Sequence, residues 1–536
     1  MSATSESGRG KRIVLLLIGA VLFGIAHSQA PLYFSNQHQY FLHGAAAGGE
    51  GLLNHDWLAN TRDPTPVFSK FVAVTYRHLH PWVFYAVHFS LMMIYFISLM
   101  MLADWLIPAK PSRSIQLFTL GCLLIVVHAG IFRWASVRWF GIDYPFYFQA
   151  GVAGQYVLGP GLQPSAFGVL LMASIAAFVR DRLVWAVVFL AAGCWMHATY
   201  LLPGALLTVA YLLSLFRERR TRAAIFLASS ALLAVLPIVV DAWLKFSPTT
   251  PEMFHQSQEL LATFRIPHHA LVSRWLDPIA IGQLTWIALA IVLLRRNKLG
   301  WVMAIAFLMA AGLAVAQVAT ENLSFALMFP WRLSVILVPI ATTAIPLFVF
   351  AYLPNRRWIW WACGILMASV VAGSIVVQVK GWGYYSDDRE LPALEFVLKQ
   401  KRPGNVYLIP VRVPGVASGP RGVVCQTFVL PAQAADKQTI PVDLQRFRLF
   451  TGAPLYIDYK SIPYKDAEVL EWRRRLQKNQ DWYKQIETNS PAVLQEMKDA
   501  GITHLVIQAD HKIPTDELIK IYEDDVYRIY QLKSAD

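Results

Sequence analysis

Long apolar runs alternate with short basic segments over the first 379 residues of the chain. A helix needs about 20 mainly apolar residues to cross a bilayer. Window reading predicts about eleven transmembrane helices, so the predicted fold class is a polytopic α-helical membrane protein. The runs lie at about 13–26, 82–107, 115–132, 166–179, 183–202, 204–215, 223–246, 279–294, 301–318, 333–353 and 358–379.

The basic residues between the runs predict an orientation. Lys11 and Arg12 precede the first run, and five later connections each carry a short basic cluster. Cytoplasmic loops of membrane proteins are enriched in Lys and Arg. We therefore expect a multi-pass protein of the cytoplasmic (inner) membrane with its amino terminus inside. An odd number of helices places the segment after residue 379 on the outer side.

The pattern changes after residue 379. Two helix-like segments, about 394–401 and 465–477, are interspersed with strand-like segments at about 405–409, 455–459, 504–508 and 526–531. Helices that alternate with strands are typical of a small α/β domain. The sequence thus predicts a transmembrane domain over 1–379 and an outward-facing, periplasmic or extracytoplasmic, α/β domain over 380–536.

The composition and the placement of the charges support a membrane protein and argue against nucleic acid as a partner. Of the 536 residues, 56% are hydrophobic and 15% are charged, whereas soluble domains carry about 25% charged residues. The net charge of +13 could indicate nucleic-acid binding. Most basic residues outside the C-terminal part stand beside apolar runs, however, so we expect contact with membrane lipid and no nucleic acid.

The outward connections are longer and richer in polar residues than the inward ones, so any chemistry is expected to face outward. The first connection, 31–81, is a long polar, aromatic and histidine-rich loop. A loop of this length is seldom only a connection. The other long outward connections are 133–165, 247–277 and 319–332.

Asp56 and Asp63 are the two aspartates of the first outward loop. A carboxylate at a membrane surface can accept a proton from an attacking hydroxyl or can ligate a divalent cation such as Mg²⁺ or Mn²⁺. Each also has a structural interpretation. Asp63 stands before Pro64 and could cap a helix that begins with proline. Asp56 could lie in the first turn of a short helix capped by Asn54.

A basic cluster marks the later outward loops. Arg265, His268 and His269 lie close together in one loop, and Arg332 opens an apolar run from the outside. Basic residues on the outward side run against the usual charge bias, which indicates binding of a phosphate. The alternative for Arg332 is a side chain that extends to lipid headgroups. The adjacent histidines cannot both face one metal from a helix, which argues against zinc.

His197 lies inside the apolar run 183–202, before Tyr200. A buried histidine with satisfied hydrogen bonds is the commoner case. A proton relay is the alternative, because polar groups at membrane depth are often functional.

The layout resembles the GT-C superfamily of membrane glycosyltransferases, which use polyprenyl-phosphate sugars as donors. The likeness covers most of the chain: an inside amino terminus, a long acidic first outward loop, many helices and an outward soluble domain. The segment Asp63-Pro64-Thr65-Pro66-Val67-Phe68 is similar to the family's second acidic segment. The chain departs from the family at Asn36-Gln37-His38-Gln39, which stands where an earlier carboxylate is expected.

The resemblance implies transfer of a sugar from a polyprenyl-phosphate donor to a cell-envelope acceptor on the outer side of the membrane. Because Asn and Gln cannot act as bases, Asp56, Asp63 or His38 would take that role. The basic residues Arg265, His268, His269 and Arg332 would hold the departing lipid phosphate, and Asp56 and Asp63 would bind a divalent cation if one is needed.

Two other functions stay open. The missing early carboxylate favours a non-catalytic GT-C-like scaffold or lipid-binding component of polysaccharide assembly, with envelope-assembly proteins as partners. A transporter or flippase is the third interpretation. It is disfavoured because the apolar runs hold few charges of the kind that couple ions to transport.

Overall fold

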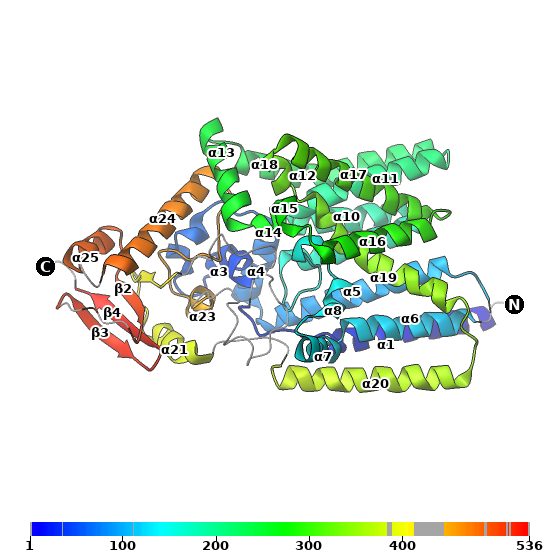
Figure 1. Ribbon diagram of the computed structural model, residues 1–536, viewed down its shortest axis with the longest axis horizontal. Coiled ribbons are helices and arrows are strands. Elements are labelled where there is room, and N and C mark those ends of the chain that lie inside the picture. The colour runs from blue at the N-terminus through cyan, green and yellow to red at the C-terminus, as the bar shows by residue number, and fades with distance from the viewer. Residues whose placement is uncertain are drawn as a thin grey trace.

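The computed structural model describes residues 3–34, 36–110, 112–382, 388–411, 444–486, 490–510, 513 and 516–533. The molecule is mostly helical and elongated, with long helices at one end and a small sheet at the other (Figure 1). The segments between these two ends carry the cavity described below.

Within the described residues, six helical spans are long and apolar enough to cross a membrane. Four are α5(Trp82–Leu106), α12(Thr221–Phe246), α17(Lys298–Thr320) and α20(Arg357–Val379). The other two are built around α11(Leu201–Arg217) and around α19(Ser334–Phe350), which the short η7(Pro330–Leu333) and α18(Leu323–Leu327) precede. The chain is thus a multi-pass membrane protein.

A bent pair and four shorter apolar helices account for the remaining predicted runs. The pair is α6(Arg113–His128) and α7(Gly130–Phe140), bent by 52°. The shorter apolar helices are the part Arg12–Ala26 of α1(Ala3–Ala26), α9(Val169–Val179) with η4(Pro164–Gly168), α10(Leu183–Met196) and α16(Pro278–Leu293). A helix of 16 residues such as α16 is only about 24 Å long, so the number of eleven crossings stays a prediction.

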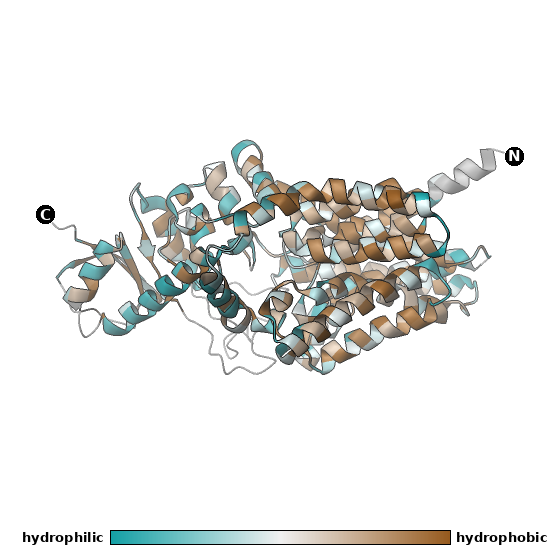
Figure 2. Ribbon diagram, turned by 90° about the horizontal axis from the view of Figure 1, so that it is seen from above, coloured by the Kyte–Doolittle hydropathy of each residue, from teal (hydrophilic) through white to brown (hydrophobic). Residues whose placement is uncertain are grey.

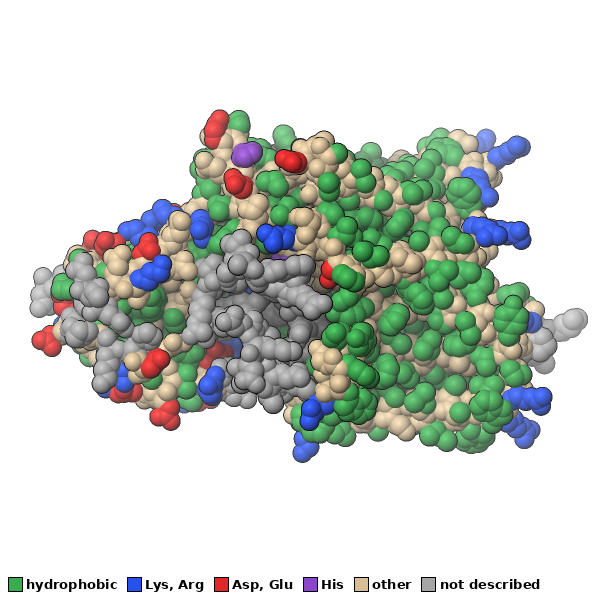
Figure 3. Space-filling model, viewed as in Figure 1, with side chains coloured by type: hydrophobic (Ala, Val, Ile, Leu, Met, Phe, Trp, Pro, Cys, Tyr) green, Lys and Arg blue, Asp and Glu red, His purple; other side chains and the backbone are tan. Residues whose placement is uncertain are grey.

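Hydropathy and charge divide along the long axis of the molecule. The long helices are largely apolar, and the sheet end is mixed (Figure 2). Figure 3 shows Lys and Arg side chains gathered at the end of the helices opposite the sheet. The orientation of the chain in the membrane stays a prediction from this same charge bias.

The first outward loop folds into short helices rather than an extended connection. They are α2(Gln37–Tyr40), α3(Leu42–Gly48), η1(Leu53–His55), η2(Leu58–Asn60) and α4(Pro66–His78). Helices α3 and α4 pack so closely that a Cβ atom on Gly44 would lie 2.5 Å from the carbonyl oxygen of Ser69. Glycine is therefore required at this crossing.

The C-terminal part contains a four-stranded sheet in the order β1-β2-β4-β3. β1(Tyr407–Leu408) pairs parallel with β2(His504–Gln508), and β4(Tyr527–Leu532) pairs antiparallel with β2 and with β3(Leu518–Glu523). The predicted strand at 455–459 is wrong, because only Leu455 forms an isolated bridge, with Tyr407. The hairpin strand β3 was not predicted.

Helices cover both faces of this sheet. Leu505 and Ile507 point into a core shared with α24(Asp466–Gln485) and α25(Ser490–Asp499). Val506 points to the other face, toward α21(Leu391–Gln400) and α23(Phe447–Thr451). Successive side chains of a strand point to opposite faces, so the apolar run of β2 fits a strand buried on both sides.

Contacts cross between the two ends of the molecule. Leu449 of α23 belongs to the core of the membrane helices, and Leu261 of an outward loop belongs to the core beside α24. The division at residue 380 stays a prediction, since these cores interlock.

Candidate functional site

A cavity of about 380 Å³ lies where the loops predicted to face outward meet the C-terminal part. All four residues predicted to bind a lipid phosphate line it, together with Arg274 and Lys460. The remaining wall residues are Asn36, Gln39, Tyr40, Pro64, Thr65, Gly154, Gln155, Tyr156, Ser165, His197, Ala198, Thr199, Ala242, Phe246, Leu261, Thr263, Phe264, Ile266, Pro267, Phe329, Tyr459, Ile462 and Tyr464. Segments distant in the sequence therefore build one site.

Arg265 enters the cavity from a π-helical turn. Helix α13(Pro251–Glu259) continues into the π-helix η6(Leu260–Arg265), and such turns often occur at functional sites. The guanidinium Nη2 donates to the carbonyl of Lys460 at 2.6 Å, and the guanidinium carbon lies 4.9 Å from the centre of the Tyr459 ring. The buried Nε has no hydrogen-bond partner among the described residues.

Arg332 enters the cavity from another segment of the chain. It lies in η7, directly after Phe329, whose φ of 51° is left-handed. Its guanidinium carbon lies 5.4 Å from the centre of the Tyr200 ring, and its buried Nε has no partner within the described ranges. The expected alternative, a side chain extended to lipid headgroups, does not fit this position in the cavity wall.

His268 and His269 lie in the short α14(Pro267–Ala270), with ring centres 4.1 Å apart. His269 Nδ1 is hydrogen bonded to the carbonyl of Ala153 at 2.7 Å, so Nδ1 is the donor. Burial lowers the pKa of His268 to about 2 and that of His269 to about 4. Both rings are therefore neutral near pH 7, and the positive charge of the cavity comes from its arginines and Lys460.

No Asp or Glu among the described residues lines the cavity. Asp63 comes nearest in sequence, because Pro64 and Thr65 are part of the wall. Asp63 Oδ1 accepts a hydrogen bond from the Thr65 amide at 2.8 Å. The helix itself begins at Pro66, with Thr65 at its cap position, so the alternative that Asp63 caps this helix is wrong.

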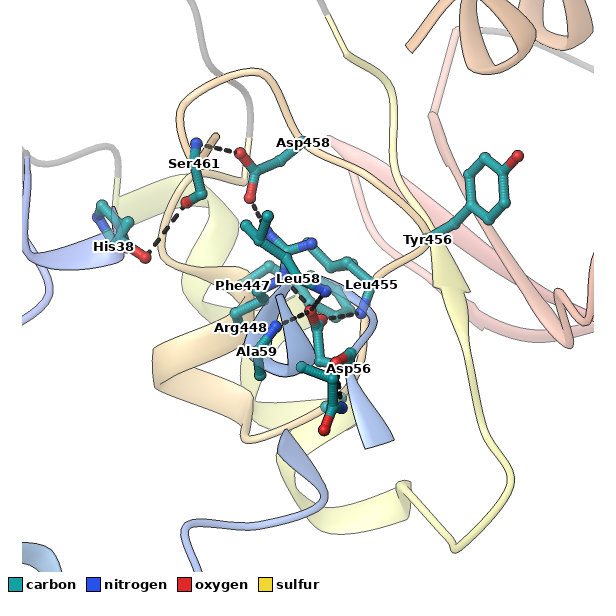
Figure 4. A network of polar contacts seen from close by, with 12 residues as sticks. His38, Asp56, Leu58, Ala59, Phe447, Arg448, Leu455, Tyr456, Asp458 and Ser461 are labelled. Atoms are coloured by element: carbon teal, nitrogen blue, oxygen red, sulfur yellow. Dashed lines mark hydrogen bonds and ion pairs between the residues drawn. The ribbon is translucent and has the colours of Figure 1, made fainter. Parts of the chain in front are cut away.

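Asp56 does not line the cavity and is fully buried in a polar network (Figure 4). Its Oδ2 accepts from Arg448 Nε at 2.7 Å and from the Leu455 amide at 2.9 Å. Its Oδ1 accepts from the amides of Leu58 and Ala59 at 2.9 and 3.3 Å. All of these bonds tie the first outward loop to itself and to the C-terminal part.

The expectation that Asp56 lies in the first turn of a helix capped by Asn54 is wrong. Asn54 lies inside η1 and caps no helix, and Asp56 follows that helix with an extended backbone. Arg448 also pairs with Asp458, whose Oδ1 accepts from the Ser461 amide at 2.6 Å. The described residues contain no group of three or more His, Cys, Asp or Glu that could hold a metal ion. We therefore assign no divalent-cation site.

His38 lies in α2, behind the cavity wall rather than in it. Its carbonyl accepts a hydrogen bond from Ser461 Oγ at 3.2 Å (Figure 4). Burial, with smaller contributions from Lys460 and Arg446, lowers the pKa of His38 to about 3. The ring is therefore neutral near pH 7, and its catalytic role stays a prediction.

Several wall residues could not be identified from the sequence. Lys460 follows a predicted strand, and Gln155, Ser165 and Thr199 belong to no motif. His197 is buried in the wall, yet neither ring nitrogen has a hydrogen-bond partner in the described part of the chain. The expectation of a satisfied buried histidine is therefore wrong.

Comparisons with known proteins give limited matches. A family model described as "Domain of unknown function (DUF6798)" matches residues 424–478. A search of functionally curated proteins finds no match. Among solved structures, the chain is similar to the crystal structure of ArnT from Cupriavidus metallidurans bound to undecaprenyl phosphate. The identity is 13%, the TM-score is 0.40, and the match covers 99% of this chain and 98% of that one.

The resemblance to GT-C glycosyltransferases stays a prediction drawn from the sequence layout. The similarity is one of overall arrangement. No residue assignment below rests on it.

Proposed function

We propose that the outward cavity binds a polyprenyl-phosphate-linked sugar and that the chain transfers this sugar to a cell-envelope acceptor. In this proposal the chain is a GT-C-type glycosyltransferase of the cytoplasmic membrane with its site on the outer side. One observation carries the proposal: Arg265, Arg332 and Lys460 converge on a cavity whose described lining holds no carboxylate. We call these three residues the cationic side.

The chemistry of the cationic side suits a phosphate. Guanidinium groups form paired, charge-assisted hydrogen bonds with phosphate oxygens. Unpaired nitrogens on Arg265 and Arg332 leave donors available for such a ligand. When the bond between the sugar and the phosphate breaks, negative charge develops on the phosphate oxygen. Fixed cations in a poorly solvated site stabilise that charge more than water does.

Asp63 is the best placed of the three predicted bases. Both oxygens of Asp56 are occupied, and His38 lies outside the wall. Asp63 directly precedes the wall residues Pro64 and Thr65. Its carboxylate would take the proton of the acceptor hydroxyl as the new glycosidic bond forms.

The same observations favour a second candidate function. A cavity without a described carboxylate, and an Asp56 committed to an ion pair, also suit a non-catalytic component of polysaccharide assembly that binds the lipid phosphate.

Binding of undecaprenyl phosphate to the purified full chain in nanodiscs, followed by native mass spectrometry, tests both candidates. We expect Arg265→Gln and Arg332→Gln to weaken binding at least tenfold. Arg138→Gln is the matched control, since Arg138 is an exposed arginine of α7 outside the cavity. Unchanged binding in both cavity variants would contradict both functions.

Transfer separates the two candidates. Membranes that contain the chain are supplied with polyprenyl-phosphate sugars, and transfer to envelope acceptors is measured. Lipid binding with transfer supports the glycosyltransferase, whereas lipid binding without transfer from any donor supports the assembly component.

A further inference from the structure

Unpaired polar atoms are concentrated in the cavity wall. Seven buried side-chain atoms of residues that line it have no hydrogen-bond partner among the described residues. They are Gln155 Oε1, Ser165 Oγ, His197 Nδ1, His197 Nε2, Thr199 Oγ1, Arg265 Nε and Arg332 Nε. Buried polar atoms in folded proteins are nearly always hydrogen bonded. The concentration therefore indicates a polar ligand.

These atoms fall into two chemically different sets. Two belong to arginines of the cationic side. The other five belong to Gln155, Ser165, His197 and Thr199, which carry amide, hydroxyl and imidazole groups, and we call these four residues the uncharged side. Gln155, Ser165 and His197 are only 4%, 5% and 3% exposed. Bulk water therefore does not satisfy them.

The position of His197 explains why its nitrogens are unpaired. It follows the last residue of α10, and its extended backbone (φ −152°, ψ 115°) breaks the helix before η5(Ala198–Tyr200). Its ring meets the rings of Tyr40 and Tyr200 at 76° and 89°, with ring centres 5.4 and 5.7 Å away. Aromatic rings hold the imidazole in place without offering it a strong acceptor.

Tyr200 joins the two sides of the cavity. The Arg332 guanidinium carbon lies 5.4 Å from the centre of the Tyr200 ring, and the His197 ring centre lies 5.7 Å from the same ring. A ligand group on the uncharged side would therefore adjoin a phosphate on the cationic side.

We propose that His197, Thr199, Ser165 and Gln155 bind an uncharged, hydroxyl-bearing group attached to the phosphate. The inference rests on the proposed function and specifies the class of sugar. Hydroxyl groups both donate and accept, as do neutral imidazole and the side chains of Ser and Thr. Such groups can therefore satisfy every atom of the uncharged side.

An ammonium group has no counterpart in this cavity. No described residue of the lining carries a carboxylate, and Arg332 lies beside the uncharged side. A sugar with a free amine would bring a positive charge next to fixed positive charges. The site thus favours a neutral sugar and disfavours an amino sugar.

The test compares lipids that differ only in the headgroup. The full chain in nanodiscs is titrated with undecaprenyl phosphate and with its glucose, galactose, mannose and glucosamine conjugates, and binding is read by native mass spectrometry. We expect at least one neutral hexose to improve affinity tenfold over the unglycosylated lipid. We expect glucosamine, with its free amine, to give no improvement.

Two variants test the residues directly. His197→Phe keeps the ring packing and removes both nitrogens, and Thr199→Val is nearly isosteric. Each should reduce the ratio of the affinity for the hexose conjugate to the affinity for undecaprenyl phosphate at least threefold. Thr208→Val is the matched control, because Thr208 bonds the Gly204 carbonyl in α11 and lies outside the cavity lining.

The outcomes separate this inference from the proposed function. Binding of undecaprenyl phosphate with no preference for any of the three hexoses would overturn the inference alone, and so would a preference that survives both variants. Absence of lipid-phosphate binding would overturn the proposed function and the inference with it. If His197→Phe fails to fold, the comparison of the five lipids on the wild-type chain still tests the inference.

Discussion

Arg448 and Asp56 form a buried ion pair across 392 positions of sequence, with Nε and Oδ2 2.7 Å apart. Arg448 is 2% exposed and Asp56 is 0% exposed. The pair joins α23 of the C-terminal part to the first outward loop. The cavity wall contains residues of the first outward loop and residues of the segment 459–464 of the C-terminal part. The ion pair therefore fixes the position of these two parts of the wall relative to each other.

We expect Asp56→Asn to destabilise the protein. Removing one partner of a buried ion pair leaves an uncompensated charge and costs about 3–5 kcal/mol. Here Arg448 would keep only Asp458. The measurement is thermal unfolding of the purified chain in detergent, read as the shift in Tm.

Glu471→Gln is the matched control, because Glu471 pairs with Arg474 at the surface, where ion pairs contribute about 0–1 kcal/mol. A Tm for Asp56→Asn equal to that of the wild type, with loss of transfer, would instead support the predicted catalytic role of Asp56.

The second prediction concerns the geometry of Arg332. A lysine in its place keeps the charge and loses the planar fork that pairs with phosphate oxygens. We expect Arg332→Lys to weaken binding of undecaprenyl phosphate about tenfold, as a charge-assisted hydrogen bond of about 1.5 kcal/mol implies. We expect Arg332→Gln to weaken it further. Equal affinities for the Lys variant and the wild type would show that charge alone matters.

The helices of the membrane part were predictable because their signal is local. An apolar run of about 20 residues predicts a transmembrane helix by itself, without information about the rest of the chain. Each predicted run coincides with a helix or a helix pair, although the sequence did not reveal the bend at Ala129 between α6 and α7. In the C-terminal part, β2 and β4 were predicted because a strand-like pattern of residues is also a local signal.

The site was only partly predictable because its contacts are not local. Arg265 and Arg332 were found from an unusual outward charge, which the sequence displays directly. Their neighbours Lys460 and His197 come from other segments, and only the fold brings them together. The pairing of Asp56 with Arg448 leaves no trace in either local sequence, so Asp56 was interpreted as free for catalysis.

The third prediction is a loss of stability in acid. Burial lowers the pKa of His268 to about 2 and that of His269 to about 4, whereas an unfolded histidine titrates near 6.5. The unfolded state therefore binds more protons below pH 6.5. Each such histidine lowers the free energy of unfolding by up to about 1.4 kcal/mol per pH unit between these pKa values.

We expect Tm to be constant above about pH 7.5 and to fall from pH 6.5 to 5. His269→Gln should make this fall shallower. His55→Gln is the control, since His55 is exposed and should leave the slope as it is. A Tm that rises as pH falls through this range would contradict the neutral, buried state of these rings.

The last prediction concerns Asp63. If its carboxylate is the base, Asp63→Asn should reduce transfer by about 10²–10⁴-fold, the usual contribution of a general base. The change preserves the size of the side chain, and the amide oxygen can still accept from the Thr65 amide. We therefore expect Tm and the affinity for undecaprenyl phosphate to stay close to the wild-type values. Transfer is measured in membranes with the polyprenyl-phosphate hexose that binds best.

Glu50→Gln is the matched control for Asp63→Asn, because Glu50 is a carboxylate of the same outward loop that does not line the cavity. It should leave transfer unchanged. Full transfer by Asp63→Asn would exclude Asp63 as the base. Since both oxygens of Asp56 are already bonded, that result would leave His38 as the predicted base to test next, followed by His197, whose ring nitrogens are also unpaired among the described residues.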